Sequence, residues 1–138
     1  MDRRTLRRGQ GLVEFALILP VLVVLMLGLV DLGRTYYAYV GITDAAREGV
    51  AYGAPHARSV LDDPTGWEAL TDEIKARATA ATEGLVEIEV DQVTVTVSDS
   101  QDSMSVTVTY SVELITPLIR NMVSGGVLPL VAVAVQSI

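Results

Sequence analysis

A long run of apolar residues stands near the start of the chain. From Leu12 to Val30 every residue is apolar or glycine except Glu14 and Pro20. As an α-helix this run is roughly 28 Å long, close to the ~30 Å hydrocarbon thickness of a bilayer. A helix also satisfies its own backbone hydrogen bonds in lipid. The pattern therefore predicts a transmembrane helix over residues 10–30, in which Pro20 removes one backbone donor and favours a kink.

The apolar run has two competing interpretations. A core helix this uniformly apolar needs a large protein around it, and the chain has only 138 residues. A secretory signal peptide has an apolar region of about 7–15 residues, followed by a cleavage site with small residues. The run is longer than that, and residues 31–34 offer no such site. A membrane anchor is favoured over both.

The charges on the two sides of the run differ. Arginines precede it at positions 3, 4, 7 and 8, whereas Asp31 and a single Arg34 follow it closely. By the positive-inside rule, the N-terminus lies in the cytoplasm and the residues after the run lie outside. Three tyrosines just past the outer end suit either an aromatic belt or packing on a continuing helix: Tyr36, Tyr37 and Tyr39.

We expect the helix to continue outside the membrane through residues 31–53. This segment has no proline, and a stripe of mostly apolar residues recurs at helical spacing. The stripe consists of Leu32, Tyr36, Tyr39, Val40, Thr43, Ala46 and Val50. Gly53, followed by Pro55, predicts the end of the helix.

Two ion pairs are expected on the other faces of this helix. Asp31 and Arg34, like Asp44 and Arg47, are three residues apart, so their side chains can meet on the helix surface. Each such pair contributes only a few tenths of a kcal/mol, about 0.2–0.5.

Residues 54–138 are expected to form a small exported domain. A linker over 54–64 leads to a helix that begins with a capping box, in which Thr65 is the N-cap and Glu68 reaches back to its amide. Gly84 predicts the helix end. The apolar positions of this helix, which we expect to pack on a sheet or on the long N-terminal helix, are Trp67, Leu70, Ile74, Ala78 and Ala81.

Alternation of apolar and polar residues then predicts an antiparallel hairpin. From Val86 apolar residues alternate with acidic ones, but the phase shifts at Asp91–Gln92. A strand cannot absorb such a shift without a β-bulge or a break, which we expect there. Regular alternation follows in residues 93–97 and, after a polar turn, in residues 104–112.

The last part of the chain predicts one more helix and one more strand. Thr116-Pro117 is typical of an N-cap and a first helical position, and the helix is expected to end near Ser124. A third strand over 127–136 contains Pro129, which favours an edge position or the beginning of the strand. The predicted fold class is α+β: a long N-terminal transmembrane helix extends into a small exported domain with one or two helices and an antiparallel sheet of about three strands.

Little in the chain points to catalysis. There is no cysteine, and the only histidine, His56, falls in the expected linker without a ligand or catalytic partner at a suitable spacing. Zinc-protease, phosphate-loop, nucleophile-elbow and dinucleotide glycine motifs do not occur. The formal net charge of −7 argues against nucleic-acid binding. We therefore expect no catalytic residue, metal or cofactor.

Glu14 is the exception, because an ionisable side chain within a membrane segment is a candidate functional residue. Burying its charge without a partner is costly, so the local pattern predicts a positively charged partner. The alternative is that its carboxylate reaches the cytoplasmic headgroups, since Glu14 lies only two residues into the run.

The residues around Glu14 resemble a prepilin processing site. In that pattern a glycine precedes the cleaved bond, the fifth mature residue is glutamate and an aromatic often follows, as Gly9, Glu14 and Phe15 do here. Residues 8–20 resemble the opening of the TadE-like pseudopilins, or minor pilins, of the Flp/Tad (type IVc) tight-adherence pilus. The resemblance continues to about residue 51 through Gly28-Leu29-Val30-Asp31-Leu32-Gly33-Arg34, Tyr37-Ala38 and Ala45-Ala46-Arg47-Glu48-Gly49.

This resemblance implies a sequence of events. A membrane-embedded prepilin peptidase would cut between Gly9 and Gln10 and remove residues 1–9 as a basic leader. Glu14 would then pair with the new α-amino group of a neighbouring subunit during assembly. Pro20 would help to shape the helix that packs in the filament core.

The resemblance also implies partners and a location. The partners would be other pilin or pseudopilin subunits and, indirectly, the assembly platform and the secretion ATPase. The chain would cross the inner membrane once and could join an extracellular pilus. Two alternatives stay open: a main filament subunit with a large head domain, and a membrane-anchored binding or sensor protein that keeps residues 1–9. An enzyme is disfavoured by the lack of paired catalytic residues.

Overall fold

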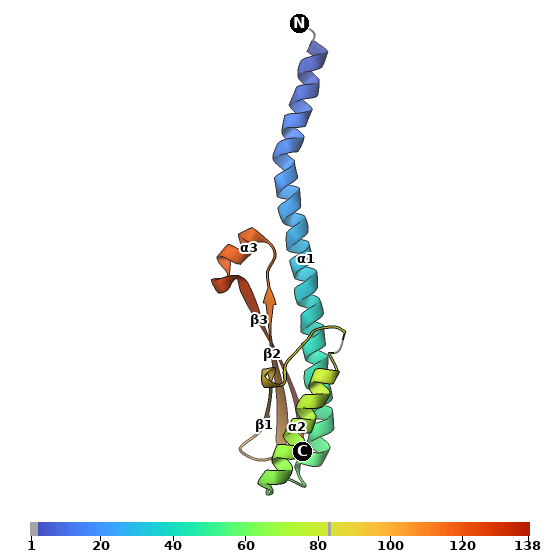
Figure 1. Ribbon diagram of the computed structural model, residues 1–138, viewed down its shortest axis with the longest axis vertical. Helices are drawn as coiled ribbons and strands as arrows, with labels where there is room; N and C mark the ends of the chain where they lie inside the picture. Colours follow the sequence, from blue (N-terminus) through green and yellow to red (C-terminus); the bar gives the residue numbers. More distant parts are fainter. Residues whose placement is uncertain (1–2, 83) are drawn as a thin grey trace. The chain divides into compact units, whose positions relative to one another are not determined.

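The predicted α+β fold class is confirmed by a computed structural model, which describes residues 3–82 and 84–138. Within these residues the elements follow the order α1, α2, β1, β2, α3 and β3, and the strands form one sheet (Figure 1). Two compact units can be distinguished. The first comprises the chain up to Arg34 together with Glu113–Val127, and the second comprises Thr35–Val112 together with Leu128–Ile138.

Helix α1 extends further than the sequence predicted. It spans Arg3–Ala57 and passes through Gly53 and Pro55 without ending. The predicted stop at Gly53 was wrong because this glycine serves close packing. A Cβ there would lie 2.5 Å from Ile74 Cδ1 and 2.7 Å from Met104 Sδ, too near for any side chain to fit without displacement.

The buried face of α1 in the second unit consists mainly of small residues. The stripe predicted from sequence is confirmed at Ala46 and Val50 but wrong at Leu32 and Tyr36, which are exposed. The large apolar side chains suggested the wrong face. The buried face is built from alanine and glycine because these small residues let the neighbouring elements approach closely. The buried small residues of this face are Ala38, Gly41, Ala45, Ala46, Gly49, Gly53, Ala54 and Ala57.

Helix α2 spans Pro64–Ala80, and its N-cap lies two residues before the predicted one. Asp63 is the N-cap, and its carboxylate accepts the backbone N–H of Thr65 at 3.1 Å. Pro64 suits the first helical position because its missing N–H has no intrahelical partner there in any case. The predicted capping box at Thr65 was therefore wrong. The helix ends at Ala80, and the predicted stop, Gly84, has φ +79° in the turn that follows.

The sheet has the order β1-β2-β3, with β1 at Val93–Val97, β2 at Ser103–Glu113 and β3 at Val127–Ser137. Strands β1 and β2 form the predicted antiparallel hairpin, in which Val93 pairs with Val108. Strand β3 lies at an edge, as Pro129 indicated. No regular strand forms over residues 86–89, where the sequence predicted one.

The predicted break near Asp91 is confirmed as a short 3₁₀ helix, Val90–Gln92. The backbone N–H of Glu89 donates to Gln92 Oε1 at 2.9 Å, and the N–H of Gln92 donates to the carbonyl of Glu89 at 3.0 Å. These bonds hold the turn that resets the phase of the alternation before β1. The hairpin therefore begins at Val93, after the shift.

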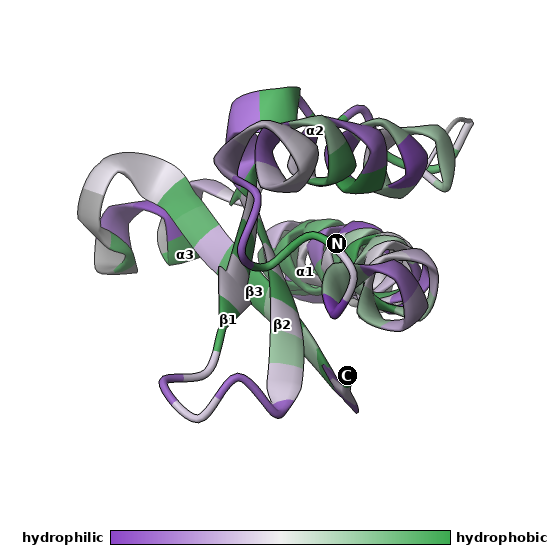
Figure 2. Ribbon diagram, turned by 90° about the horizontal axis from the view of Figure 1, so that it is seen from below, coloured by the Kyte–Doolittle hydropathy of each residue, from purple (hydrophilic) through white to green (hydrophobic). Residues whose placement is uncertain are grey.

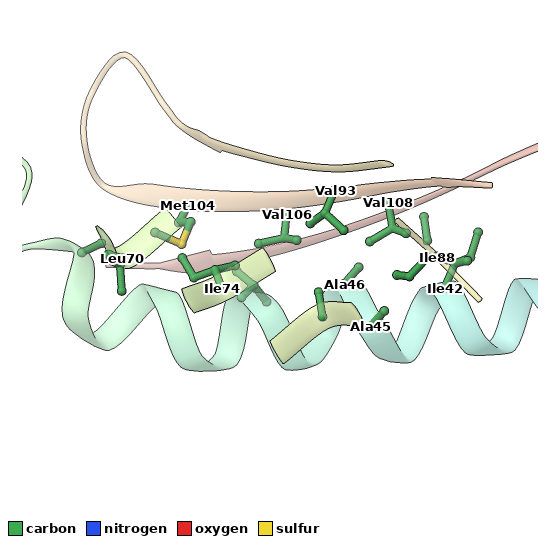
Figure 3. Close-up of a cluster of buried hydrophobic side chains, with 14 residues drawn as sticks. Ile42, Ala45, Ala46, Leu70, Ile74, Ile88, Val93, Met104, Val106 and Val108 are labelled. Carbon is green, nitrogen blue, oxygen red and sulfur yellow. The ribbon is translucent and has the colours of Figure 1, made fainter. Parts of the chain in front are cut away.

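The hydrophobic core of the second unit lies between α1, α2 and one face of the sheet. Figure 2 shows α2 beside α1 with the sheet next to both. Figure 3 shows side chains of β1 and β2 above those of α1. The larger buried side chains of this core are Ile42, Val50, Leu70, Ile74, Ile88, Val93, Met104, Val106 and Val108.

Helix α3 spans Pro117–Met122 and belongs to the first unit. Thr116 is its N-cap and Pro117 opens it, as predicted, although the helix ends two residues before Ser124. A 3₁₀ turn, Ser124–Gly126, follows it. The turn needs glycine at two positions, because Gly125 and Gly126 have φ of +77° and +69°. The N–H of Leu114 donates to the carbonyl of Gly126 at 3.1 Å and closes this excursion.

Candidate assembly segment and the Asp31 anchor

The N-terminal part of α1 presents apolar side chains to its surroundings on nearly all sides. Leu12 is 71% exposed and Leu29 is 70% exposed. Within the described residues, α1 from Gln10 onward is the one helix long and apolar enough to cross a membrane. Because water solvates such a surface poorly, the segment needs lipid or other apolar helices around it.

The residues of the predicted processing site are helical. Gly9 and Gln10 both lie within α1, so the bond between them is part of the helix. One turn further on, the side-chain amide of Gln10 donates to Glu14 Oε1 at 3.2 Å. Among residues 10–82 and 84–138, no lysine or arginine forms an ion pair with Glu14. The carboxylate is exposed and has a neutral donor beside it.

The other two predicted assembly residues do not join this pair. Phe15 is 57% exposed. Pro20 is also exposed, and α1 is helical on both sides of it. Because proline has no N–H, the carbonyl of Ala16 lacks its usual intrahelical partner. The structure therefore brings Gln10 and Glu14 together and leaves Phe15 and Pro20 on the open surface of the helix.

A second carboxylate, Asp31, lies at the C-terminal end of the apolar run and is only 3% exposed. It binds the chain just before α3. The N–H of Ile115 donates to Oδ1 at 2.9 Å, and the N–H of Thr116 donates to Oδ2 at 2.7 Å. The charge is thus satisfied by two backbone N–H groups. They lie at the N-terminus of α3, where N–H groups have no partner within the helix.

The sequence did not reveal this anchor. The predicted Asp31–Arg34 ion pair is absent from the described residues, whereas the exposed Asp44–Arg47 pair is present at 3.6 Å. Arg34, three residues away, offered a nearer partner than a segment more than eighty residues later. The one signal was position: an acid that directly follows Val30 sits where water is scarce, and buried acids need donors.

The aromatic residues divide between surface and core. Tyr36, Tyr37 and Tyr39 are 69%, 52% and 48% exposed, so they do not pack within the chain. His56 lies in the last turn of α1, not in a linker, and its ring stacks on Tyr52 at 4.9 Å. The single tryptophan, Trp67, packs against the core as predicted.

No cluster in the described part of the chain has the composition of a metal site. Residues 3–82 and 84–138 contain no group of three or more histidine, aspartate or glutamate side chains placed to hold an ion.

Comparison with known families identifies the same segment. Residues 9–51 match the family model described as TadE-like protein. No curated protein and no solved structure matches the chain. The match confirms the resemblance read from the sequence: the N-terminal segment, residues 9–51, is similar to TadE-like proteins.

The match begins at Gly9 and covers Glu14, Pro20 and Asp31. At the level of the family, the match supports a role as a minor pilin related to the Tad pilus. The single apolar helix fits a membrane anchor that carries a C-terminal domain.

Proposed function

We propose that this chain is a minor pilin, or pseudopilin, of a Tad pilus that a prepilin peptidase matures by cleavage between Gly9 and Gln10. Residues 10–30 then hold the protein in the inner membrane, with residues 54–138 on the outer side. From there the subunit acts in initiation or assembly of the pilus, with other pilin subunits as its direct partners. The platform protein and the secretion ATPase act on it indirectly.

One observation carries this proposal: an exposed carboxylate stands in an otherwise apolar helical surface. Glu14 has only the neutral amide of Gln10 beside it, at 3.2 Å. In lipid or between packed helices, such a charge needs a positive partner. Cleavage before Gln10 would create one, because it turns the Gln10 backbone nitrogen into an α-amino group.

The new amine of a neighbouring subunit can replace the Gln10 side chain as the donor to Glu14. An ionised donor makes a shorter and stronger hydrogen bond to a carboxylate than a neutral amide does. Leaving one member of a buried pair without its partner costs about 3–5 kcal/mol. Glu14 can therefore be buried at low cost only when neighbouring subunits are in the register that brings the amine to it.

A Glu14→Ala substitution tests the role of the carboxylate. We expect normal cleavage, because the glycine and the bond after it are intact, together with a severe loss of pili or of pilus initiation. Glu48→Ala is the matched control, since it removes an exposed carboxylate from the same helix outside the apolar run. Glu14→Gln keeps the size without the charge and should also assemble poorly.

Normal piliation of the Glu14→Ala strain would refute the pairing role. An anchored binding or sensor protein makes a different prediction: its N-terminus stays intact and its activity does not depend on Glu14. If the chain were the main filament subunit, deleting its gene would remove the filament protein altogether. If it is a minor subunit, the deletion strain would still contain filament protein in its membrane.

A further inference from the structure

A short segment of the first unit is held beside the end of the apolar run. Asp31 binds the backbone of Ile115 and Thr116, which fixes the start of the segment next to the first residue after Val30. Further along, Ile119 of α3 approaches Gly28, where a Cβ would lie 3.8 Å from Ile119 Cδ1. The segment thus reaches α1 at the level of Asp31 and again, through Ile119, at the level of Gly28, about 4.5 Å into the run.

The side chains of this segment divide into an anchored side and an open side. Leu114 and Thr116 are buried, whereas Ile115 between them is 50% exposed. Arg120 is exposed on α3. The segment therefore exposes a large apolar side chain and a basic side chain.

We propose that residues 114–123 form a second membrane-contacting element, which lies in the headgroup region of the leaflet at the Asp31 end of the span. Ile115 faces the acyl chains there, and the guanidinium of Arg120 binds lipid phosphates. This inference rests on the proposal that residues 10–30 cross a bilayer.

Continuity with the span selects lipid as the occupant of this surface. A span of roughly 28 Å barely crosses a hydrocarbon core of about 30 Å, so Gly28 cannot lie far outside the bilayer. Whatever touches Gly28 from the same unit lies at that depth too, and Ile119 does. Short amphipathic segments with a basic residue and an apolar face lie in this region.

The hydrogen bonds of Asp31 lower the cost of placing its charge at the edge of the bilayer. Asp31 follows Val30 directly and would be costly at the edge of the hydrocarbon if its oxygens depended on water. Both oxygens accept backbone N–H groups instead, and the residue is 3% exposed. The carboxylate also accepts the N–H groups of Ile115 and Thr116, because unpaired N–H groups are costly in lipid.

The absence of cysteine from the chain permits a clean test. Single-cysteine variants Ile115→Cys, Leu22→Cys and Val131→Cys of the full chain are labelled with a nitroxide and placed in vesicles of phosphatidylethanolamine and phosphatidylglycerol. Collision rates with oxygen, which concentrates in lipid, and with a water-soluble nickel complex report the depth. Val131 is the matched control, since it is 54% exposed on β3.

We expect the ratio of oxygen to nickel collisions at position 115 to exceed that at position 131 severalfold and to approach that at position 22. Equal ratios at 115 and 131 with a high ratio at 22 would overturn the inference while leaving the membrane anchor intact. A low ratio at 22 would refute the anchor and the inference together. Protection from both reagents at 115 would show burial in protein and would overturn the assignment to lipid.

Discussion

The carboxylate of Asp31 accepts the backbone N–H of Thr116 at 2.7 Å, although 85 positions separate the two residues in the sequence. The bond joins the C-terminal end of the apolar run to the N-cap of α3 within one compact unit. Since Asp31 lies inside the family match and Thr116 outside it, this contact connects the TadE-like segment to the part of the chain without a family model.

Replacing Asp31 with alanine should release residues 114–123. Hydrogen bonds to a charged group contribute about 1.5–3 kcal/mol, so the amides of Ile115 and Thr116 should exchange with solvent roughly ten- to a hundredfold faster. Hydrogen exchange of the full chain in micelles or nanodiscs measures this directly. Asp44→Ala is the control, because its exposed pair with Arg47 contributes less than about 1 kcal/mol. Unchanged protection in Asp31→Ala would contradict the anchor.

A methyl group at position 53 should destabilise the second unit. A Cβ at Gly53 would lie 2.5 Å from Ile74 Cδ1, and Ile74 and Met104 are both fully buried, so neither can move aside freely. Overpacking of this kind costs about 1–3 kcal/mol. We expect Gly53→Ala to lower the free energy of unfolding by that amount in denaturant titrations.

Gly33→Ala is the matched control for this substitution. It lies in the same helix, and a Cβ there meets nothing within 4 Å. Helix propensity then makes it neutral or stabilising by up to about 1 kcal/mol. If the two variants unfolded alike, the close packing at Gly53 would be refuted.

The turn between β1 and β2 should respond to acid through Asp102. Hydrogen bonds from the hydroxyls of Ser100 and Ser98 hold the pKa of the Asp102 carboxyl below its usual range. Because the folded pKa is the lower one, this carboxylate stabilises the turn above the unfolded pKa of about 4. The contribution is lost as the pH falls through the lowered value.

Ser100→Ala tests this effect, because it removes the hydrogen bond that lowers the pKa of Asp102 most. We expect the pKa of Asp102 to rise toward the value in an unfolded chain when its side-chain carbonyl resonance is followed by NMR. Ser59→Ala removes a hydroxyl that donates only to the carbonyl of His56, and it should leave the titration of Asp102 unchanged. An identical titration curve in both variants would contradict the account.

The sequence predicted the elements whose pattern is regular and local. The alternation in residues 104–112 and the N-cap at Thr116 depend on neighbouring residues, and both are confirmed. The strand predicted from Val86 failed although its alternation was clear, because hydrogen bonds between Glu89 and Gln92 favour a turn there.

Features that depend on distant contacts could not be predicted from the sequence. The face that α1 turns to the core consists mainly of glycines and alanines, with Ile42 and Val50 among them, so a search for large apolar residues selects the wrong stripe. Gly53 has the local features of a helix end, and only the approach of Ile74 and Met104 explains it. The Asp31 anchor likewise requires a partner from the far end of the chain.

If the proposed maturation is correct, cleavage should depend on the size of the residue before the cut. Gly9 lies within α1, where glycine is a poor helix former, and recognition by a peptidase would explain its presence there. We expect Gly9→Val to leave the chain in the membrane at the size of the precursor, with Gly11→Ala as a control that is still processed. A normal shift in gel mobility of Gly9→Val would refute the assigned site.

The most direct test of the central claim is the mass of the N-terminal peptide of the protein from native membranes, with and without the prepilin peptidase. We predict an N-terminus at Gln10 in cells with the peptidase and an uncleaved leader in cells without it. An N-terminus at Met1 or Asp2 in both would contradict maturation as a pilin and would favour a permanently anchored binding protein.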